Sequence, residues 1–540
     1  MIDARRRRWL TGLAAAAATA AVAPWAWLRW QRGSITTAKA ALPAPPPVVE
    51  RFPHPLRLPG KDGLLAEINL SQSVTLHAKA GNFALFEGAP TILWHYAASI
   101  DAREIANPLL HARSGDTLDV ALANELDEAT TLHWHGLSVD EANDGSGLHP
   151  VAAGTQTRYR FPVRNRAGLY WYHAHPHGRT GVQVQRGLAG PLLVDDAEEQ
   201  ALRAQLDLRW GERDLLLMLA DRQVDARNAF VYPETDADDW IGNRVLVNWT
   251  PDAHINAVRG LYRLRLANVA NARLFRLAFQ HRAENLPFRL IGTDGGLLSE
   301  AWNVEDLFLA PAQRADVLVD FSQVPAGERV LLRSLDYVAM DNDDDAGGLQ
   351  ADPMGEHPGA MRMGSALDIM EFRFAGPAVA TVSLPKTLST LPAPPETAGW
   401  PVRPLRLQMD KDGTWLINDW NFHKQGHAPV FSVKRGSREV WEIRNAMTSM
   451  PHPIHVHGFQ FRVISRSISP MDIRARQVAP GGLLPHDLGL NDTVLVWPGE
   501  VVRIAMDFAQ ACRGTQRYML HCHNLEHEDR GMMVTFAVVD

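Results

Sequence analysis

The residues with the greatest chemical potential lie near the C-terminus, where His521, Cys522 and His523 are followed by His527 and Met532. One cysteine thiolate with two imidazoles and a distant thioether is typical of an electron-transfer copper site. Side chains alternate between the two faces of a β-strand. Cys522 therefore points to one face and its neighbouring histidines point to the other, so this stretch can serve two metal centres. Structural zinc is the alternative, but zinc uses four ligands in one closed tetrahedron.

Three further His-x-His pairs precede this stretch. In a strand, both imidazoles of such a pair project from the same face. With the pair around Cys522 they give eight imidazoles, enough for three copper ions that keep positions open for oxygen. His452, the cysteine, His527 and Met532 remain for a mononuclear copper. The three pairs are His133 and His135, His173 and His175, and His455 and His457.

These four motifs, in this order, resemble the four copper signatures of the multicopper oxidases, the family of laccases, bilirubin oxidases and copper-efflux oxidases. The resemblance implies three cupredoxin domains and four copper ions. It also implies that a donor loses single electrons at a type 1 copper while O₂ is reduced to water at a trinuclear cluster between the first and third domains. The implied ligands are His452, Cys522, His527 and Met532 for type 1, His133 and His455 for type 2, and His135, His173, His175, His457, His521 and His523 for the type 3 pair.

Asp144 and Glu528 match acidic residues that the family places near the cluster. Either carboxyl could move the protons that oxygen reduction consumes, or could orient a ligand imidazole. Asp144 also lies in an Asn-Asp-Gly sequence that favours a turn, and Glu528 could be a solvated loop carboxylate. Glu526 and Asp529 are predicted to lie at the surface. The other loop histidines are predicted to be hydrogen-bonded rather than metal-bound, namely His149, His177, His423 and His486.

The bulk composition sets the class of protein. A chain of 540 residues is too long for one hydrophobic core and predicts three or four domains. An apolar content of 46% with 21% charged residues is ordinary for a globular protein, and a net charge of -7 gives no reason to expect nucleic acid. Only two cysteines are present. Cys522 is assigned to metal, and Cys512 is predicted to be a buried structural thiol.

A loose internal repeat indicates three related units. Apolar residues alternate up to Asn124, Asn268 and Asn445, at domain-sized intervals of 144 and 177 residues. Short alternating strands broken by Gly, Pro and Asn predict β-sandwiches. A histidine pair follows the first and third asparagines, whereas Leu277-Ala278-Phe279 follows the second. Together with the resemblance, this predicts an all-β chain of three cupredoxin-like Greek-key β-sandwich domains with a metal-free middle unit.

Residues 1–40 are predicted to be an export signal rather than part of the fold. Arg5 to Arg8 precede an alanine-rich apolar run, which resembles a twin-arginine signal and predicts a periplasmic protein. If uncleaved, the run from Trp9 to Leu28 is long enough to anchor the chain in a membrane. A Pro-rich spacer is predicted at 41–61. The predicted domains are 62–196, 197–376 and 405–540, with a Pro-rich linker at 377–404.

Two features bear on the electron donor. Met450 matches a position where copper-efflux oxidases bind Cu(I), but Thr448 stands where an acidic partner is expected, and the Met- and His-rich insertion is missing. Five methionines could recruit copper or fill irregular packing. We predict a monomeric laccase-like oxidase of phenols and aromatic amines with some Cu(I) activity; the alternative is a periplasmic copper-tolerance protein acting mainly as a cuprous oxidase or copper buffer. The five methionines are Met340, Met354, Met361, Met363 and Met370.

Overall fold

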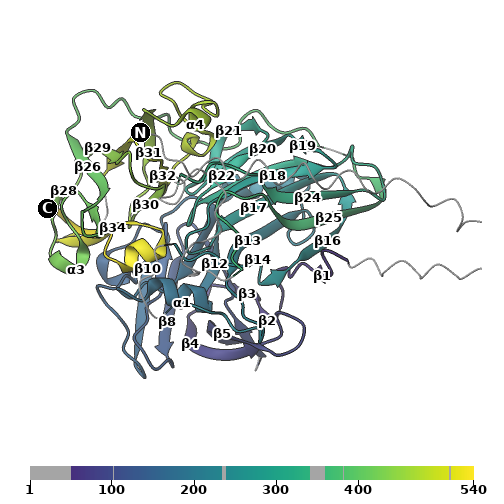
Figure 1. The fold of residues 1–540 in the computed structure, drawn as a ribbon, viewed down its shortest axis with the longest axis horizontal. Coiled ribbons are helices and arrows are strands. Elements are labelled where there is room, and N and C mark those ends of the chain that lie inside the picture. Colours follow the sequence, from purple (N-terminus) through teal and green to yellow (C-terminus); the bar gives the residue numbers. More distant parts are fainter. Residues whose placement is uncertain are drawn as a thin grey trace, which may run out of the picture. The chain divides into compact units, whose positions relative to one another are not determined.

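The computed structural model describes residues 50–540 except 62, 101–102, 234–238, 341–358, 381 and 510–511. The predicted export signal at 1–40 and residues 41–49 of the predicted spacer at 41–61 lie outside the described residues. Six β-sheets form three sandwiches, so the predicted all-β fold is confirmed (Figure 1). Within the described residues, no helix is long and apolar enough to cross a membrane. The short helices and 3-10 turns are α1 (Thr180–Arg186), α2 (Ala197–Leu206), α3 (Phe422–Gln425), α4 (Met471–Arg474), α5 (Leu525–Asp529), η1 (Glu141–Asn143) and η3 (Pro485–Leu488).

The first sandwich packs a six-stranded sheet on a five-stranded sheet. Leu118, Val120 and Leu122 are buried in β8 while the residues between them are not, which is the period-two pattern that the sequence predicted. The six-stranded sheet has the order β10 (Gln156–Pro162), β8 (Thr117–Asn124), β4 (Val74–Phe83), β5 (Thr91–Ile100), β6 (Arg103–Ala106) and β2 (Gly63–Leu64). The other has the order β3 (Glu67–Asn69), β7 (Leu109–Arg113), β12 (Ala189–Asp195), β11 (Gly168–His173) and β9 (His133–His135).

The second sandwich consists of two seven-stranded sheets. Residues 54–55, inside the predicted spacer, form β1 and pair in parallel with β16 of this sandwich. One sheet has the order β1 (His54–Pro55), β16 (Ala253–Arg259), β25 (Leu367–Ala378), β24 (Arg329–Ser334), β18 (Phe275–His281) and β19 (Glu284–Leu286), with β22 (Leu307–Leu309) also paired to β18. The other has the order β15 (Thr250–Pro251), β14 (Arg244–Val247), β13 (Asp214–Arg222), β17 (Leu261–Asn268), β23 (Arg314–Asp320), β20 (Phe288–Thr293) and β21 (Gly296–Val304).

The third sandwich contains two five-stranded sheets. Its core holds Trp415, Trp441 and Phe536, all inaccessible to solvent, together with the candidate ligands Cys522 and Met532. One sheet has the order β27 (Trp415–Ile417), β26 (Val402–Met409), β29 (Arg438–Asn445), β33 (Val501–Asp507) and β31 (Arg462–Ser467). The other has the order β28 (Phe431–Lys434), β35 (Met533–Val539), β34 (Gln516–Cys522), β30 (His452–Val456) and β32 (Thr493–Val496).

The predicted repeat ends in the same structural device in each sandwich. Asn124, Asn268 and Asn445 are buried at the ends of β8, β17 and β29. Each side-chain amide ties down the connection to the next strand by donating two hydrogen bonds to backbone carbonyls. The accepting residues are Glu128 and Val151 for the first, Arg273 and Leu309 for the second, and Met450 and Val496 for the third. This asparagine clamp fixes where β9, β18 and β30 begin.

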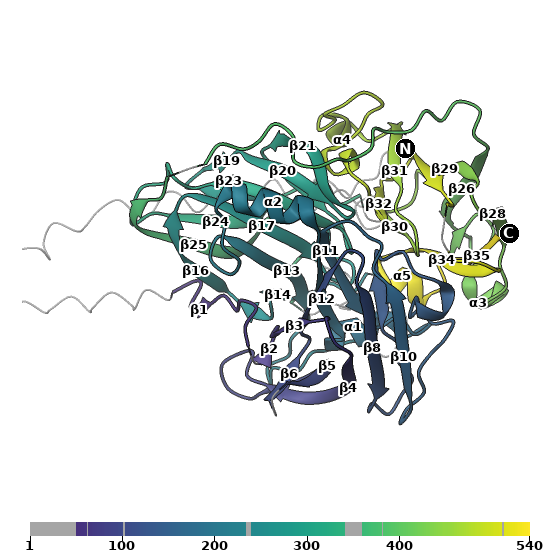
Figure 2. The same ribbon diagram turned by 180° about the vertical axis from the view of Figure 1, so that it is seen from behind.

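The first and third sandwiches contact each other directly, although they are far apart in sequence. The Tyr518 hydroxyl of β34 donates to the backbone oxygen of Val139 at 2.8 Å, and Arg517 pairs with Glu141. The N-terminal end of α1 meets α5, where Asp529 accepts a hydrogen bond from the backbone of Thr180 at 2.8 Å (Figure 2). These contacts bring the histidine pairs of β9 and β11 to those of β30 and β34.

Candidate metal centres

The first candidate centre lies inside the third sandwich and joins Cys522, His452 and His527. β30 and β34 are paired with Ile454 opposite Cys522, and α5 follows at once, capped by the Asn524 side chain. The Nδ1 atoms of His452 and His527 each lie 3.5 Å from the Cys522 sulfur. All three side chains are fully buried. Two imidazole nitrogens therefore face one thiol in a site closed to water.

Met532 is fixed beside this centre by the turn after α5. Its backbone N–H donates to the His527 oxygen at 2.8 Å, and its own oxygen accepts from the Cys522 N–H at 3.0 Å. Gly531 precedes it with φ of 90°, a conformation that favours glycine. The Met532 side chain is fully buried in the same core as Cys522. A thioether is thus held within the cluster that contains the thiol.

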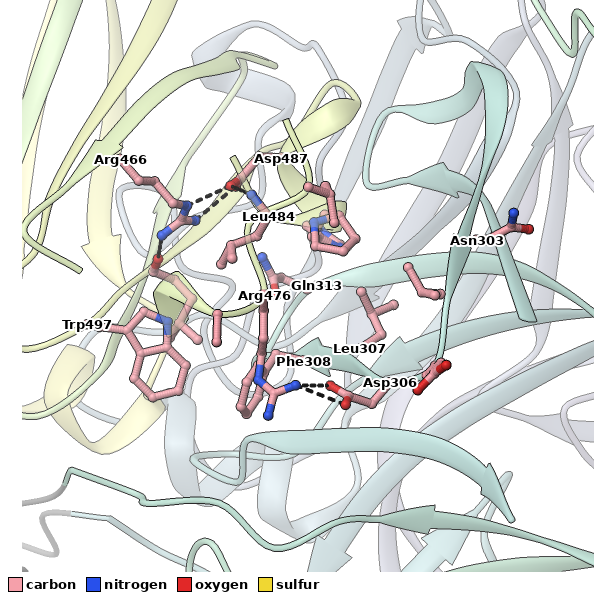
Figure 3. Close-up of a pocket in the computed structure, with 17 residues that line it drawn as sticks. Asn303, Asp306, Leu307, Phe308, Gln313, Arg466, Arg476, Leu484, Asp487 and Trp497 are labelled. Carbon is pink, nitrogen blue, oxygen red and sulfur yellow. Dashed lines mark hydrogen bonds and ion pairs between the residues drawn. The ribbon is translucent and has the colours of Figure 1, made fainter. Parts of the chain in front are cut away.

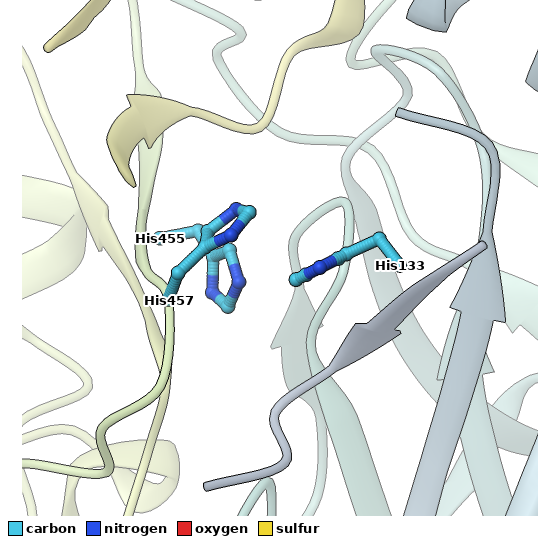
Figure 4. Close-up of side chains that lie close together, drawn as sticks. All are labelled: His133, His455 and His457. Carbon is cyan, nitrogen blue, oxygen red and sulfur yellow. The ribbon is translucent and has the colours of Figure 1, made fainter. Parts of the chain in front are cut away.

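The second candidate centre is the set of eight predicted imidazoles, which the structure brings together from two sandwiches. The His133 ring stacks on His457 with centroids 4.0 Å apart, and His135 stacks on His455 at 3.8 Å. His133 thus faces His455 and His457 across the interface of the sandwiches (Figure 4). All eight are buried: His133, His135, His173, His175, His455, His457, His521 and His523.

Hydrogen bonds to backbone carbonyls fix which nitrogen carries the proton in four of these rings. A carbonyl oxygen only accepts, so the ring nitrogen that faces it is an N–H and the other nitrogen carries a lone pair. These four bonds run from His133 Nδ1 to Asp144 (2.8 Å), from His173 Nδ1 to Ala174 (2.9 Å), from His455 Nδ1 to Asp492 (2.8 Å) and from His521 Nδ1 to Cys522 (3.0 Å). In two further rings a nitrogen faces a side-chain carboxyl: His457 Nδ1 lies 2.8 Å from Asp144, and His135 Nε2 lies 3.0 Å from Asp492.

The remaining nitrogens converge on one another. His521 Nε2 lies 3.0 Å from His457 Nε2 and 3.3 Å from His175 Nε2. Burial lowers the pKa of His173 to about 3 and that of His175 to about 4, so these rings stay neutral at physiological pH. Such a contact is held either by a proton on one of the two nitrogens or by a metal ion that both nitrogens bind through their lone pairs. The donor set therefore fits metal ions, and imidazole is a good ligand for copper.

Asp144, the first of the two predicted acids, lies against two of these imidazoles. Its Oδ2 accepts from His457 Nδ1, and its Oδ1 lies 3.7 Å from His133 Nδ1. The carboxyl is 1% exposed. Burial raises the pKa of Asp144 to about 8, against the smaller opposing effect of the Ser146 hydroxyl. Asp144 also ends the turn η1, so the turn-forming and site-facing interpretations both describe this residue.

Glu528, the second acid, lies on the opposite side of the cluster. Its two oxygens lie 3.3 Å from His175 Nδ1 and 3.2 Å from His521 Nδ1, and one accepts a hydrogen bond from the Thr180 hydroxyl at 2.6 Å. Burial acts to raise its pKa, but His175 and His521 together outweigh burial and hold the pKa of Glu528 below its usual range. With 2% of its surface exposed, Glu528 is not the solvated loop carboxylate considered as its alternative.

Sequence reasoning missed a buried ionic network behind the cluster. Asp492 accepts from His135 through its carboxylate and from His455 through its backbone oxygen. Arg314, from the second sandwich, donates to that carboxylate at 2.8 Å, and the Arg314 backbone N–H donates to Asp294 at 2.8 Å. All these side chains are buried. A lone Asp and a lone Arg carry no spacing signal, so only the fold reveals that they orient imidazoles.

The prediction that Glu526 and Asp529 lie at the surface was wrong. Glu526 is 1% exposed and accepts hydrogen bonds from Asn271 at 2.8 Å and from the Tyr232 hydroxyl at 3.0 Å. Burial raises the pKa of Glu526 to about 7. Asp529 is half-buried, because it accepts from the backbone of Thr180 at the start of α1. These acids join α5 to the other two sandwiches. The charged composition of α5 gave no sign of these contacts.

Two further predictions about isolated residues have mixed outcomes. Cys512 is a free thiol but is half-buried, so the prediction of a buried thiol was wrong. Three of the four loop histidines are hydrogen-bonded as predicted, whereas His177 Nε2 has no hydrogen-bond partner among the described residues. The three pairs are His149 with Glu141, His423 with the Asp529 carbonyl, and His486 with Asp294.

Three cupredoxin-like sandwiches with a Cys-His₂ centre and an imidazole cluster define a copper-binding oxidoreductase, and known proteins agree. Three sequence models of the multicopper oxidase family match residues 97–199, 255–343 and 401–540. A multicopper oxidase of Staphylococcus haemolyticus is 30% identical over 440 residues, which cover 81% of this chain and 83% of that protein. A laccase of Bacillus stratosphericus is 30% identical over 510 residues, which cover 83% of this chain and 91% of that protein.

The crystal structure of the McoA multicopper oxidase of Aquifex aeolicus has the same fold. It superimposes with a TM-score of 0.79 at 32% identity and covers 90% of this chain and 99% of that chain. The chain belongs to the multicopper oxidase family. It is therefore a copper enzyme that takes electrons from a donor and passes them to O₂, as the four motifs predicted.

Proposed function

We propose that the chain binds four copper ions, one inside the third sandwich and three between the first and third sandwiches. The observation that carries this proposal is the convergence of buried imidazole lone pairs from both sandwiches. The proposed ligands are His452, Cys522, His527 and the weak axial Met532 for type 1; His133 and His455 for type 2; His135, His173 and His523 for one type 3 ion; and His175, His457 and His521 for the other.

Distances between rings support this division of the imidazoles. His135, His173 and His523 form a triangle with centroids 5.0 to 5.7 Å apart. The other proposed type 3 set shares the short Nε2 contacts around His521. When bound, copper supplies one-electron oxidation of the donor at the type 1 site and four-electron reduction of O₂ to water at the cluster. The protein joins the two sites through the backbone of three consecutive residues, His521 to His523.

The proposed role of Asp144 and Glu528 is to supply protons and to hold imidazoles in place. Each carboxyl is buried and lies within 3.3 Å of a proposed ligand nitrogen. Oxygen reduction consumes protons inside a site that bulk water does not reach, so a carboxyl at the wall can relay them. The Thr180 hydroxyl donates to Glu528, which keeps this carboxylate turned toward His175 and His521.

Copper analysis of a matched pair of cysteine variants tests the proposal. Purified protein should bind four copper ions per chain and show the intense thiolate-to-copper absorption. Cys522→Ser should bind three, lose the blue colour and lose oxygen uptake, because the only thiol of the type 1 set is gone. Cys512→Ser should keep all three properties, since this half-buried thiol belongs to neither set of proposed ligands. A blue, active Cys522→Ser protein would refute the assignment.

A small hollow beside the type 1 ligands supports Cu(I) as one electron donor. Met363 and Met450 line a space of about 30 Å³, together with Asp239 from the second sandwich. Asp239 lies 3.6 Å from His527 Nε2 and is hydrogen-bonded to Asn524. Soft thioethers beside a carboxylate suit Cu(I), and a space of this size holds an ion or a water molecule rather than an aromatic ring.

The methionines that were predicted either to recruit copper or to fill irregular packing therefore fall into two groups. Met363 lines this hollow, whereas Met370 is fully buried in the core of the second sandwich. Met354 lies outside the described residues. The sequence motif lacks an acidic partner because Thr448 occupies that position, and Asp239 supplies a carboxylate beside His527 instead. Nothing in the sequence around Asp239 marks it as a partner of His527.

Steady-state oxygen uptake with Cu(I) as the electron donor tests this donor site. The double variant Met363→Leu and Met450→Leu preserves volume while removing both thioethers, and should lower kcat/KM for Cu(I) at least about tenfold, a loss of 1.4 kcal/mol. Met447→Leu is the matched control, because Met447 is 76% exposed and does not line the hollow. Unchanged Cu(I) kinetics in the double variant would contradict a thioether site.

We also propose that the protein is exported to the periplasm by its predicted twin-arginine signal. The proposal rests on Arg5 to Arg8 and the apolar run that follows them, all outside the described residues. Replacing Arg6 and Arg7 with lysine should leave the protein in the cytoplasmic fraction. Recovery of that variant in the periplasmic fraction would contradict the proposal. The predicted monomeric state stays a prediction that size-exclusion chromatography can test.

A further inference from the structure

A pair of imidazoles lies outside the two candidate centres, where the first sandwich meets the third. His177 belongs to the connection between β11 and α1, two residues after His175, and its Nε2 has no hydrogen-bond partner among the described residues. Its ring lies edge-to-face with that of His427, which follows α3 in the third sandwich, and the two centroids are 5.1 Å apart. His427 is exposed, whereas His177 is half-buried. The pair therefore opens to solvent on one side.

Close packing holds the two rings together. The Phe422 ring meets His177 edge-to-face with centroids 4.3 Å apart, and it stacks on His427 at 5.4 Å. On the other side of His177, a β-carbon at Gly147 would lie 2.4 to 2.6 Å from three atoms of the imidazole, so a larger residue there would displace the ring. A buried nitrogen without a partner destabilises the folded chain. This imidazole is thus fixed in place without a hydrogen bond to its Nε2.

The spacing of the pair is that of two imidazoles which share one metal ion. The rings of His452 and His527, proposed to hold the type 1 copper together, are also 5.1 Å apart. Two imidazoles on one tetrahedral ion, each about 2.0–2.1 Å from the metal, place their ring centroids about 5 Å apart. Imidazole suits copper and zinc. Because only two protein ligands meet here, water would fill the other positions, and the ion could leave easily.

The pair is the outer end of a row of imidazoles that leads to the cluster. The centroid of His177 lies 6.3 Å from that of His175, and His175 lies 5.0 Å from His521. Exposure falls along this row, since His427 is exposed and the two inner rings are fully buried. At the inner end, the Glu528 carboxylate lies 3.3 Å from His175 Nδ1. A cation at the pair would therefore be attracted inward.

A cavity between the second and third sandwiches offers no comparable row. Its volume is about 280 Å³, and His486 is the one imidazole among its described lining residues (Figure 3). His486 Nε2 faces the Asp294 carboxylate at 3.2 Å. The guanidinium groups of Arg466 and Arg476 also lie in the wall. An ion in this cavity would find a single ring and two cationic side chains, so the pair at His177 is the better route to the cluster.

We propose that His177 and His427 form an entry site through which copper ions reach the imidazole cluster. This inference rests on the proposed function. A hydrated ion exchanges water for the two imidazoles at the surface, and it then exchanges His427 for His175 as it moves inward. Each step replaces one neutral ligand by another, so no electron or proton is transferred. The type 1 copper is not expected to use this site, because its ligands lie inside the third sandwich.

Zinc binding to the copper-loaded full chain tests the site itself. Zn(II) has no redox chemistry and binds imidazole, so it reports on the pair alone. A calorimetric titration of tag-free protein should show a zinc site that His427→Ala weakens at least about tenfold. His423→Ala is the matched control, because His423 is also exposed but its Nε2 faces the Asp529 carbonyl at 2.8 Å. Equal zinc binding in all three proteins would mean adventitious binding only and would overturn the inference.

The rate of copper uptake tests the entry role. Copper-free full chain is mixed with copper, the reaction is stopped with a chelator at successive times, and the retained copper is counted. His427→Ala should fill the three cluster positions at least about tenfold more slowly, while the blue type 1 colour develops at the wild-type rate. Wild-type filling of the cluster in His427→Ala would overturn the inference. A wild-type protein that retains only one copper would instead refute the proposed function, and the zinc titration would still decide whether the pair binds metal.

Discussion

The strands that follow the three asparagine clamps occupy equivalent positions in their sandwiches, but they carry either histidines or apolar side chains. In the first and third sandwiches, β9 and β30 carry histidines that face the interface between the two. In the second, β18 carries Leu277 and Phe279, which are 1% and 0% exposed inside its own core. The clamp donates two hydrogen bonds to backbone carbonyls in all three sandwiches, although only Asn124 and Asn268 also accept a backbone N–H through Oδ1. The fold thus offers three equivalent positions, and the side chains alone decide where a metal centre forms.

The difference also shows what a buried imidazole pair requires. Leu277 and Phe279 need only close packing, whereas the imidazoles of the cluster need oxygens that hold one nitrogen of each ring. Asp144 and Asp492 provide four of these contacts, from the first and third sandwiches. The second sandwich contributes Arg314, which holds Asp492 in place. The second sandwich is therefore more than a passive spacer.

The most direct test of this comparison is to introduce the histidine motif into the second sandwich. In the double variant Leu277→His and Phe279→His, two imidazoles replace apolar side chains where no oxygen is arranged to receive them. Lost packing and unpaired buried nitrogens should lower the free energy of unfolding by on the order of 5 kcal/mol or more. Urea unfolding of the copper-free protein measures this loss.

Copper stoichiometry provides the second measurement on the same variant. It should not rise above that of the wild type, because the new pair has no partner pair across an interface. The volume-conserving Leu277→Met is the control and should cost less than about 1.5 kcal/mol. An additional bound copper in the histidine variant would show that the motif alone creates a centre.

Removing Arg314 tests whether the second sandwich stabilises the proposed copper sites at the interface of the other two. Arg314→Met leaves the buried carboxylates of Asp492 and Asp294 without their shared cation, which should cost about 3–5 kcal/mol. Asp492 should then hold His135 less firmly, so copper affinity should fall about 10- to 100-fold, as for other residues that orient a ligand. Equilibrium dialysis against a copper chelator measures the affinity.

A surface ion pair of similar geometry is the matched control. Arg158 donates two hydrogen bonds to Asp119 across β10 and β8, but its side chain is 59% exposed. Arg158→Met should therefore cost less than about 1 kcal/mol and leave copper affinity unchanged. Equal effects of the two substitutions on copper affinity would indicate that Arg314 has no specific role at the interface.

Removing the clamp asparagines tests how far the clamps of the second and third sandwiches are equivalent. Asn268→Ala and Asn445→Ala each remove a buried amide and leave two carbonyls unpaired, so each should lower the free energy of unfolding by about 2–3 kcal/mol. The loss should be larger for Asn268→Ala by about 1 kcal/mol in copper-free protein, because Asn268 Oδ1 also accepts from the Ala270 N–H at 3.0 Å, whereas Asn445 Oδ1 has no hydrogen-bond partner among the described residues. With copper bound, only Asn445→Ala should also change the visible spectrum, since its connection leads to His452.

The sequence was sufficient to predict the three sandwiches, the repeat, and the histidines and cysteine that the structure brings together, whereas their copper ligation stays a prediction. These predictions succeeded because His-x-His pairs and strand alternation are local patterns with a fixed period. The division into domains at 62–196, 197–376 and 405–540 stays a prediction, although residues 54–55 pair with the second sandwich rather than acting only as a spacer. The roles of Asp144 and Glu528 came from resemblance rather than from pattern.

The contacts that the sequence did not reveal are those that cross between sandwiches. Asp239, Arg314 and Asp492 each lie in a segment with no distinctive spacing, and their partners in other sandwiches are more than 170 residues away. Glu526 was misjudged for a related reason. Charged residues on a short helix usually face water, but this one is covered by Asn271 and Tyr232 of the second sandwich. Tertiary neighbours, which no local pattern encodes, decide such positions.

The smallest predicted effect concerns a buried polar cluster of the second sandwich, which differs in charge from the imidazole cluster. Glu199 accepts from Arg263 at 2.7 and 2.8 Å and from Arg265 at 2.5 Å, and all three side chains are 1% exposed. Burial acts to raise its pKa, but the two guanidinium groups outweigh burial and hold the pKa of Glu199 well below its usual 4.5. This cluster is charged at neutral pH, whereas burial keeps the imidazole cluster neutral.

A carboxyl with a depressed folded pKa stabilises the protein above the unfolded pKa, and this stabilisation is lost as pH falls toward the folded pKa. Below pH 4.5, Glu199 should therefore contribute a loss of up to about 1.4 kcal/mol per pH unit. Glutamine does not titrate, so Glu199→Gln should be less stable at neutral pH but should lose less between pH 4.5 and 3.5. Urea unfolding of both copper-free proteins over that range measures the difference in slope, in which the titrations of all other groups cancel. Parallel slopes would mean that Glu199 is not held ionised by its arginines, and the second sandwich would then lack the charged counterpart to the imidazole cluster.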